Sequence, residues 1–312
     1  MDALNTFTST GSKLIHHPQV VTWLRANRPR VLSLQAAPTS LCNLNCNFCS
    51  NANRTKGESI DFDRLIKLID ELHIWGLRTV EWTGGGDPTL YTQINEAVAY
   101  CSKYFRQGMI TNGLGFANLS DETLESLFWI RISMNGMDYD RQASKPPSSF
   151  KGTLSMSYVY NELTTQDTLD EIKARADAWG AQVIRVVPNC LTTDEEQDQN
   201  NKILAERVKG WGKPWFYQPK VFGAPERCYW GYIKPFALHD GYIYPCSSVV
   251  LNEGSEGVFH SKYRWATYEA FVEKYSEVMV PFEPINCSHC VFRSQNDLVS
   301  NLINPTGMED FV

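Results

Sequence analysis

The chain has 312 residues, of which 43% are hydrophobic and 21% are charged, close to the average of globular domains. This composition excludes a mainly disordered chain, a collagen-like repeat and a coiled coil. The formal net charge of −6 argues against duplex nucleic-acid binding through a basic surface, but it leaves a small nucleotide substrate open. No run of about 18 apolar residues and no apolar signal-peptide core is present, so we expect a cytoplasmic protein without a membrane contact.

The chain contains nine cysteines, a number that cannot be paired completely. Disulfides are rare in the reducing cytoplasm, so pairing is not the expected use of these thiols. The number of cysteines therefore indicates metal binding.

Predicted strands alternate with amphipathic helices over the first two thirds of the chain. We expect six strands, at residues 30–35, 78–83, 108–111, 129–134, 153–160 and 182–187. The helices between them are predicted from Asp61 to Gly76, at 93–104, from Ser120 to Leu127, and from about Leu169 to Gly180. This alternation indicates parallel βαβ units, in which functional residues gather beyond the carboxyl ends of the strands.

The pattern changes after about residue 192. A charged helix at 194–209 leads into a Gly/Pro loop, a strand at 215–220, and a hairpin with strands 232–239 and 242–244 around Asp240-Gly241. A further helix is predicted near residues 268–278. We place a domain boundary near residue 211. Residues 1–29 then form an N-terminal extension, 30–210 a first domain and 211–312 a second one.

Three cysteines lie on one loop after the first predicted strand, with the spacing C-x3-C-x2-C: Cys42, Cys46 and Cys49. Three thiolates can hold three irons of a [4Fe–4S] cluster and leave the fourth iron open to a second molecule. The spacing alone also permits three of four zinc ligands or three buried thiols.

With Phe48 before the third cysteine, this loop resembles the signature of the radical S-adenosylmethionine (radical SAM) enzymes. Three later stretches, residues 83–89, 110–113 and 130–136, are similar to motifs of that family in the expected order. The resemblance covers about residues 30–190. It implies an α/β fold, a partial (β/α)6 TIM-like barrel followed by a small α/β iron–sulfur domain.

The resemblance also implies the chemistry. S-adenosylmethionine would chelate the open iron, and its reductive cleavage would give a 5′-deoxyadenosyl radical that abstracts hydrogen from a substrate. The residues that the resemblance places at S-adenosylmethionine are Gly84, Gly85, Gly86, Asp87, Asn112, Ser133, Asn135 and Arg185. Glycines let the backbone approach a ligand closely. Asp87 stands where the family has a glutamate, with the right charge for the methionyl ammonium and a shorter reach. Three of these residues also have an ordinary structural explanation. Ser133 could be a hydroxyl on a strand, Asn135 a turn residue, and Arg185 a partner in a surface salt bridge.

Four further cysteines lie in the second domain: Cys228, Cys246, Cys287 and Cys290. Four thiolates can hold zinc or an iron–sulfur cluster. Their pattern resembles the twitch domain, a shortened form of the SPASM extension. This resemblance implies one auxiliary [4Fe–4S] cluster with no open iron, which suits electron transfer better than substrate binding.

Two cysteines remain. Cys101 falls on the apolar face of a predicted helix and is expected to be a core thiol. Cys190 follows the sixth strand and could donate a hydrogen atom to a substrate radical, although a partly buried inert thiol is the favoured explanation. His289 lies between two cysteines and is either a hydrogen-bond donor to a cluster or a spacer.

The favoured function is a net oxidation, in which the auxiliary cluster accepts an electron from the substrate radical. The alternative reaction is a redox-neutral epimerisation or isomerisation. The non-enzymatic alternative is a zinc-stabilised binding protein. The substrate is a small molecule, a peptide or a nucleotide. Only about 29 residues precede the first strand, which favours a small molecule over a peptide. No flavin or nicotinamide fingerprint is present, so flavodoxin or ferredoxin is the expected reductant.

Overall fold

The strands of the chain pair side by side in one curved sheet. The computed structural model describes residues 3–252, 259, 261–283, 287–308 and 310. Within this part of the chain, ten strands follow the order β10-β9-β8-β1-β2-β3-β4-β5-β6-β7. Pairing is parallel from β8 through β1 to β7 and antiparallel between β8, β9 and β10. The predicted α/β fold with a partial parallel barrel is confirmed.

The observed strands fall close to the predicted ones. They are β1 (Ser33–Ala37), β2 (Thr79–Trp82), β3 (Arg106–Thr111), β4 (Leu127–Ser133), β5 (Thr153–Tyr160), β6 (Ile184–Pro188), β7 (Trp215–Tyr217), β8 (Phe236–Leu238), β9 (Tyr242–Tyr244) and β10 (Ala266–Thr267).

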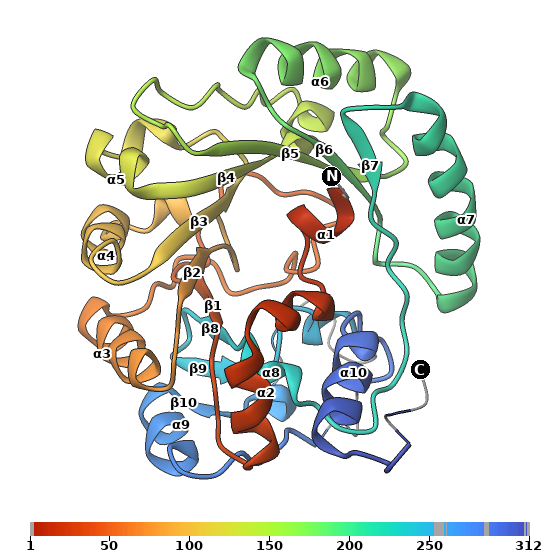
Figure 1. Ribbon diagram of the computed structural model, residues 1–312. Coiled ribbons are helices and arrows are strands. Elements are labelled where there is room, and N and C mark those ends of the chain that lie inside the picture. The colour runs from red at the N-terminus through yellow and green to blue at the C-terminus, as the bar shows by residue number, and fades with distance from the viewer. Residues whose placement is uncertain (1–2, 253–258, 260, 284–286, 309, 311–312) are drawn as a thin grey trace.

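Helices cover the outer side of the sheet, and α3 to α7 follow one another around it (Figure 1). The α-helices are α1 (Ala3–Phe7), α2 (Pro18–Arg25), α3 (Phe62–Ile74), α4 (Ile94–Cys101), α5 (Asp121–Ser126), α6 (Gln166–Trp179), α7 (Asp194–Trp211), α8 (Trp230–Ile233), α9 (Tyr268–Tyr275) and α10 (Arg293–Ile303). Short 3-10 helices include η2 (Pro88–Leu90) and η4 (Met134–Tyr139). No helix in the described ranges combines the length and the apolar composition needed to cross a membrane.

Local sequence signals fix the helix ends where they were expected. The Asp61 carboxylate accepts a hydrogen bond of 3.0 Å from the backbone N–H of Arg64, and the Ser120 hydroxyl accepts one of 3.2 Å from that of Thr123. Such caps satisfy backbone donors that a helix start leaves free. Gly180 ends α6 with φ = 75°, a left-handed conformation that glycine adopts without strain.

The predicted strand at residues 232–239 is wrong in its first half. Residues 230–233 form the short helix α8, and β8 begins only at Phe236. Lys234 N–H donates to the Trp230 carbonyl at 2.9 Å, so the chain is still turning helically one residue before Pro235. Proline lacks the N–H that a strand would use, and the ladder starts after it.

Two strands from beyond residue 211 join the barrel sheet. β7 pairs with β6, and β8 pairs in parallel with β1, with Gln35 opposite Phe236. The sheet is therefore continuous across the boundary that we place near residue 211, and that boundary stays a prediction.

The N-terminal residues, expected only as an extension, pack against the barrel. Figure 1 shows α1 near β6 and β7, and α2 beside α10. The Arg131 guanidinium, on β4, donates to the Phe7 carbonyl. Arg25 Nε donates to the Leu302 carbonyl at 2.6 Å, which ties the first helices to the last one.

Candidate functional site

The first three cysteines lie on a loop that leaves the carboxyl end of β1. Cys42, Cys46 and Cys49 are all free thiols that keep some accessible surface. A turn between the last two, with Cys49 N–H on the Cys46 carbonyl at 3.1 Å, brings their side chains together. The loop is anchored by Arg54, whose Nε donates to the Ser40 carbonyl at 2.8 Å.

The three thiols influence one another. Burial raises the pKa of Cys46 to about 12, and the charges of Cys49 and Cys42 add to that rise. Burial also raises the pKa of Cys42. A bound cationic centre would offset both effects, because metal binding stabilises the thiolate. In the described ranges, no three histidine, cysteine or carboxylate side chains are arranged to hold a metal ion directly. The thiolates that bind a cubane cluster lie further apart than the ligands of a single metal ion, since each thiolate binds a different iron.

The three glycines after β2 pack against the start of the cysteine loop. Gly86 N–H donates to the Thr39 carbonyl at 2.8 Å, and Asp87 N–H donates to the Leu41 carbonyl at 2.7 Å. A Cβ on Gly86 would lie 1.9 Å from the Leu41 carbonyl oxygen, and one on Gly84 would lie 1.5 Å from the Gly86 carbonyl oxygen. No side chain fits there, so this loop and the cysteine loop meet backbone to backbone.

Asp87 is buried, and its carboxylate is occupied by the protein itself. Its oxygens accept hydrogen bonds from Thr89 N–H at 3.0 Å, the Thr89 hydroxyl at 2.6 Å, the Thr111 hydroxyl at 2.9 Å and Asn112 N–H at 2.7 Å. Burial raises the pKa of this carboxyl, whereas the hydrogen bonds lower it. These donors use the lone pairs that the expected contact with a methionyl ammonium would need. In this arrangement Asp87 joins the glycine loop to the end of β3.

Asn112 connects β3 to the cysteine loop. Its Nδ2 donates to Asn43 Oδ1 at 2.6 Å and lies 3.8 Å from the Cys42 sulfur. Its Oδ1 accepts from Leu114 N–H at 2.9 Å. Hydrogen bonds to cluster sulfurs tune the reduction potential of iron–sulfur centres, so Asn112 is positioned to act on the cysteine site directly.

Ser133 is the last residue of β4, and Asn135 lies just after it in η4, at the same end of the barrel. Asn135 is buried, and its amide bonds the backbone of Val159 in both directions, at 2.7 and 2.9 Å, and Asp138 at 2.8 Å. It therefore joins β4 to β5. Asp138 also accepts from the Tyr158 hydroxyl at 2.7 Å, and its charge raises the pKa of Cys46. Asp138 lies on η4, and no motif in the sequence marks it as a site residue.

Arg185 and Cys190 lie on and just after β6. Arg185 Nη1 donates to Gln218 Oε1 at 2.9 Å, so the surface salt bridge offered as an explanation is absent among the described residues. The Cys190 thiol lies 3.7 Å from the Pro188 carbonyl. Burial raises its pKa, and the charges of Lys220 and Arg185 lower it. Cys101, by contrast, is a fully buried core residue of α4, as predicted.

The four remaining cysteines converge, although 62 positions separate the numbers of the first and the last. Burial raises the pKa of each of them, and the charges of neighbouring cysteines add to the rise for Cys228, Cys246 and Cys287. Cys228 and Phe282 exchange backbone hydrogen bonds of 3.4 and 3.3 Å. This bridge places the segment before Cys287 beside Cys228.

Asn296, on α10, supports this second set. It is buried, its Oδ1 accepts from Tyr229 and Trp230 N–H at 2.8 Å each, and its side chain hydrogen-bonds the Cys228 thiol. Thiols of this kind, brought together and surrounded by hydrogen-bond donors, fit an iron–sulfur cluster. The cysteine pattern that predicts this site ends at Cys290, so it does not include Asn296.

An open cavity of about 540 Å³ is lined both by the first cysteine site and by residues near the second set. Cys49 lines it from the first site, Cys190 from the end of β6, and Asn252 and His289 from the second region. His289 N–H donates to Asn252 Oδ1 at 2.9 Å, and its Nε2 lies 2.9 Å from Asp194. His289 therefore joins the second region to the start of α7 at the wall of this cavity.

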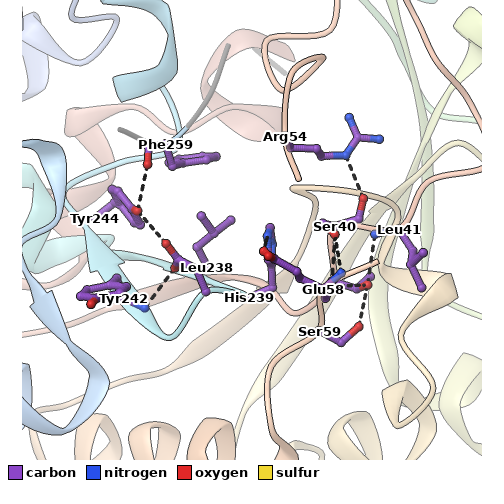
Figure 2. Close-up of polar contacts among 12 residues, drawn as sticks. Ser40, Leu41, Arg54, Glu58, Ser59, Leu238, His239, Tyr242, Tyr244 and Phe259 are labelled. Carbon is purple, nitrogen blue, oxygen red and sulfur yellow. Dashed lines mark hydrogen bonds and ion pairs between the residues drawn. The ribbon is translucent and has the colours of Figure 1, made fainter. Parts of the chain in front are cut away.

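A second junction joins the hairpin β8–β9 to the cysteine loop. Figure 2 shows His239, at the end of β8, beside Glu58, with Ser40 and Arg54 nearby. The His239 ring is buried, and its Nε2 lies 3.5 Å from Glu58 Oε2. A Cβ on Gly85 would lie 2.9 Å from His239 Nδ1, so the hairpin also touches the glycine loop.

Comparison with known proteins shows what the segment around this site is similar to. Residues 37–155 match the model of the Radical SAM superfamily. The chain is 31% identical over 114 residues to a "Probable GTP 3′,8-cyclase" of Thermoplasma volcanium, and the match covers 35% of each chain. It is 30% identical over 120 residues to the protein of the same name in Pyrococcus abyssi. The match thus spans about a third of the length of these curated relatives.

The fold is similar to that of solved structures. Streptococcus suis SuiB bound to the precursor peptide SuiA has a TM-score of 0.59 at 14% identity, over 87% of this chain and 71% of that one. The anSMEcpe structure with bound AdoMet and the Kp18Cys peptide has a TM-score of 0.53 at 13% identity, over 88% and 84%. At such identities these structures show the shared fold alone. Residues 37–155 are thus similar to the Radical SAM superfamily, and the two curated relatives carry the names of enzymes.

Proposed function

We propose that this enzyme oxidises a substrate bound between its two cysteine sites, using S-adenosylmethionine and two [4Fe–4S] clusters. The observation that carries the proposal is the cavity of about 540 Å³, which Cys49 of the first site and His289 of the second region both line. A substrate in this cavity lies between a centre that can start radical chemistry and one that can accept an electron.

Cys42, Cys46 and Cys49 would hold the first cluster, which with S-adenosylmethionine supplies the 5′-deoxyadenosyl radical that removes a hydrogen atom from the substrate. The backbone of Gly84–Gly86 and the Ser133 hydroxyl are the groups that we propose for binding S-adenosylmethionine. Asp87, Asn112 and Asn135 would act as positioning residues, because their hydrogen bonds tie the ends of β2 to β5 to the cysteine loop.

Cys228, Cys246, Cys287 and Cys290 would hold the second cluster, which supplies an acceptor for one electron. The substrate would lose one hydrogen atom to the S-adenosylmethionine-derived radical, one electron to this acceptor and one proton to solvent, a net two-electron oxidation. A flavodoxin or ferredoxin supplies the electron that S-adenosylmethionine cleavage consumes. The names of the curated relatives favour a nucleotide or another small molecule as substrate, and the peptide bound to SuiB keeps a peptide among the candidates.

A redox-neutral reaction is the second candidate, and the position of Cys190 favours it. Its sulfur lines the same cavity, so the thiol could return a hydrogen atom to a substrate radical. Burial raises the pKa of this thiol, which keeps it in the protonated form that donation requires.

The decisive experiment compares wild type with the Cys287→Ala/Cys290→Ala variant after anaerobic reconstitution. We expect the variant to keep the first cluster and its cleavage of S-adenosylmethionine, and to lose nearly all oxidised product. Product at the wild-type yield from a folded variant would refute the electron-acceptor role. Zinc at this site in the wild-type protein, shown by metal analysis, would refute the second cluster.

A further inference from the structure

Positive side chains gather inside the barrel. Lys220 is influenced by the charges of Arg185, Arg131 and Lys234. The carboxylate that acts on Arg131 and Arg185 is Glu81, and Lys234 already holds it at 2.6 Å. One carboxylate thus faces several cations, and the interior carries an excess of positive charge.

Two of these cations have unused donors. Arg131 is buried, with 8% of its surface exposed, and its Nε has no hydrogen-bond partner among the described residues. In the same ranges, Arg185 Nε is buried and equally without a partner. The contact that Arg185 does make, through Nη1 to Gln218, is with a neutral amide. An unsatisfied buried donor is costly, and a guanidinium more so.

Lys220 completes the group, and its backbone is held firmly. Asn201, a buried residue of α7, donates to the Lys220 carbonyl at 2.7 Å and accepts from Lys220 N–H at 3.1 Å. Burial lowers the pKa of the Lys220 ammonium to about 8, and the charge of Arg185 adds to this effect. Burial likewise lowers the pKa of Arg185 to about 9.

Cys190 connects this group of cations to the cavity that Cys49 and His289 line. Lys220 and Arg185 are the charges that lower the pKa of Cys190, and Cys190 lines that cavity. Both cations keep part of their surface accessible, although protein surrounds them. Their charges therefore act on the Cys190 thiol in the wall of the cavity, although neither side chain lines the cavity itself.

We propose that Arg185 and Lys220, assisted by Arg131, bind an anionic group of the substrate, a carboxylate or a phosphate. Two largely enclosed cations whose charges act on each other are repelled, and a bound anion offsets the repulsion and offers an acceptor to the unsatisfied donors. A guanidinium offers parallel N–H donors to such a group, and an ammonium adds a point charge. This inference rests on the proposed function, because it takes the cavity to be the substrate site.

The methionyl carboxylate of S-adenosylmethionine is the other anion that this group could hold, as the family resemblance implies for Arg185. The two sources differ in one respect. A site for the substrate stays open when S-adenosylmethionine is bound, whereas a site for its carboxylate is then filled.

The test is isothermal titration of the reconstituted full chain with sulfate, as a stand-in for phosphate, and with acetate. We expect saturable binding of at least one of them, with and without saturating S-adenosylmethionine. Arg185→Met and Lys220→Met should each weaken it about tenfold or more, as loss of a charge-assisted hydrogen bond does. Lys202→Met, which changes an exposed lysine of α7, should leave it unchanged.

Three results would overturn the inference: no binding to the wild-type chain, equal binding to all variants, or competition between the anion and S-adenosylmethionine. Arg185→Lys and Lys220→Arg keep the charges and should retain most of the affinity, which separates loss of charge from loss of folding. Reductive cleavage of S-adenosylmethionine is measured separately. Its absence would refute the proposed function while the anion titration still reported on this site.

Discussion

Gly86 lies directly against Leu41, the residue before the first cysteine, so closely that an added Cβ would be 1.9 Å from the Leu41 carbonyl oxygen. The next backbone N–H, that of Asp87, donates to the same carbonyl at 2.7 Å. The position of the cysteine loop is thus set by contact with the loop after β2. The glycines serve this contact between two chain segments, in addition to any contact with a ligand.

Gly86→Ala should therefore destabilise the protein. A methyl group at this position forces a backbone shift, which we expect to cost about 1–3 kcal/mol of the free energy of unfolding. Gly210→Ala is the matched control, because a Cβ at Gly210 meets no atom within 4 Å and the residue lies in α7. It should leave the stability unchanged or raise it by up to about 1 kcal/mol. Urea unfolding of both variants measures this difference, and equal stability would contradict the packing argument.

Replacing Cys42, Cys46 and Cys49 together by alanine should remove one cluster and leave the other. The two sets of thiols lie on different segments, so the second set does not depend on the first for its ligands. We expect about half of the iron to remain after reconstitution, with no cleavage of S-adenosylmethionine. Iron analysis and the yield of 5′-deoxyadenosine check this. Complete loss of iron, or cleavage that persists, would show that the sets are not separate.

Asp87→Ala should destabilise the protein more than Asp87→Asn. The alanine leaves buried donors of Thr89, Thr111 and Asn112 without an acceptor, and each such donor costs about 1–3 kcal/mol. The asparagine retains one oxygen as an acceptor. Thermal unfolding of the two variants should rank them in this order. If Asp87 instead binds the methionyl ammonium alone, both variants would lose affinity for S-adenosylmethionine while their stability stayed equal.

Lys234→Met should lower the free energy of unfolding, because it leaves the buried Glu81 carboxylate without its ion-pair partner. Burial raises the pKa of Glu81, but the charge and the hydrogen bond of Lys234, with smaller effects of Arg131 and Gln35, together outweigh burial and lower it. The pair therefore stabilises the protein above the pKa of an unfolded glutamate, and this contribution is lost as the pH falls through the lower pKa of the folded state. Without Lys234 the folded pKa rises, so the variant should lose about 3–5 kcal/mol near pH 7 and less near pH 5. Urea unfolding at both pH values measures the change. Adding Glu81→Gln should recover part of the loss.

Sulfate affinity should fall as the pH rises through about 8, where Lys220 loses its proton. The groups whose charges act on Lys220 are Arg185, Cys190, Arg131 and Lys234. Sulfate keeps its own charge over this range, so the change reports on the protein. Lys220→Arg should move the fall in affinity to higher pH, because the guanidinium stays protonated longer. Titration calorimetry at pH 7 and pH 9 provides the measurement, and a pH-independent affinity in the wild-type chain would contradict the role of Lys220.

The sequence by itself determined the parts of this protein that depend on neighbouring residues. The βαβ alternation, the caps at Asp61 and Ser120, the end of α6 at Gly180 and the cysteine spacings are local patterns with local physical causes. The first half of the predicted strand 232–239 failed for a local reason too, since Pro235 delays the ladder. The motif residues were also expected to gather at one end of the barrel, because the carboxyl ends of parallel strands meet there.

Tertiary structure decided what distant segments do to one another. The pairing of β8 with β1, the hydrogen bonds that occupy Asp87 and the approach of Lys220 to Arg185 join residues that no sequence period relates. The sequence identifies a carboxylate or an ammonium, but it does not show whether water or another charge faces that group. Its partners, and with them its pKa and its role, follow only from the packing of the folded chain.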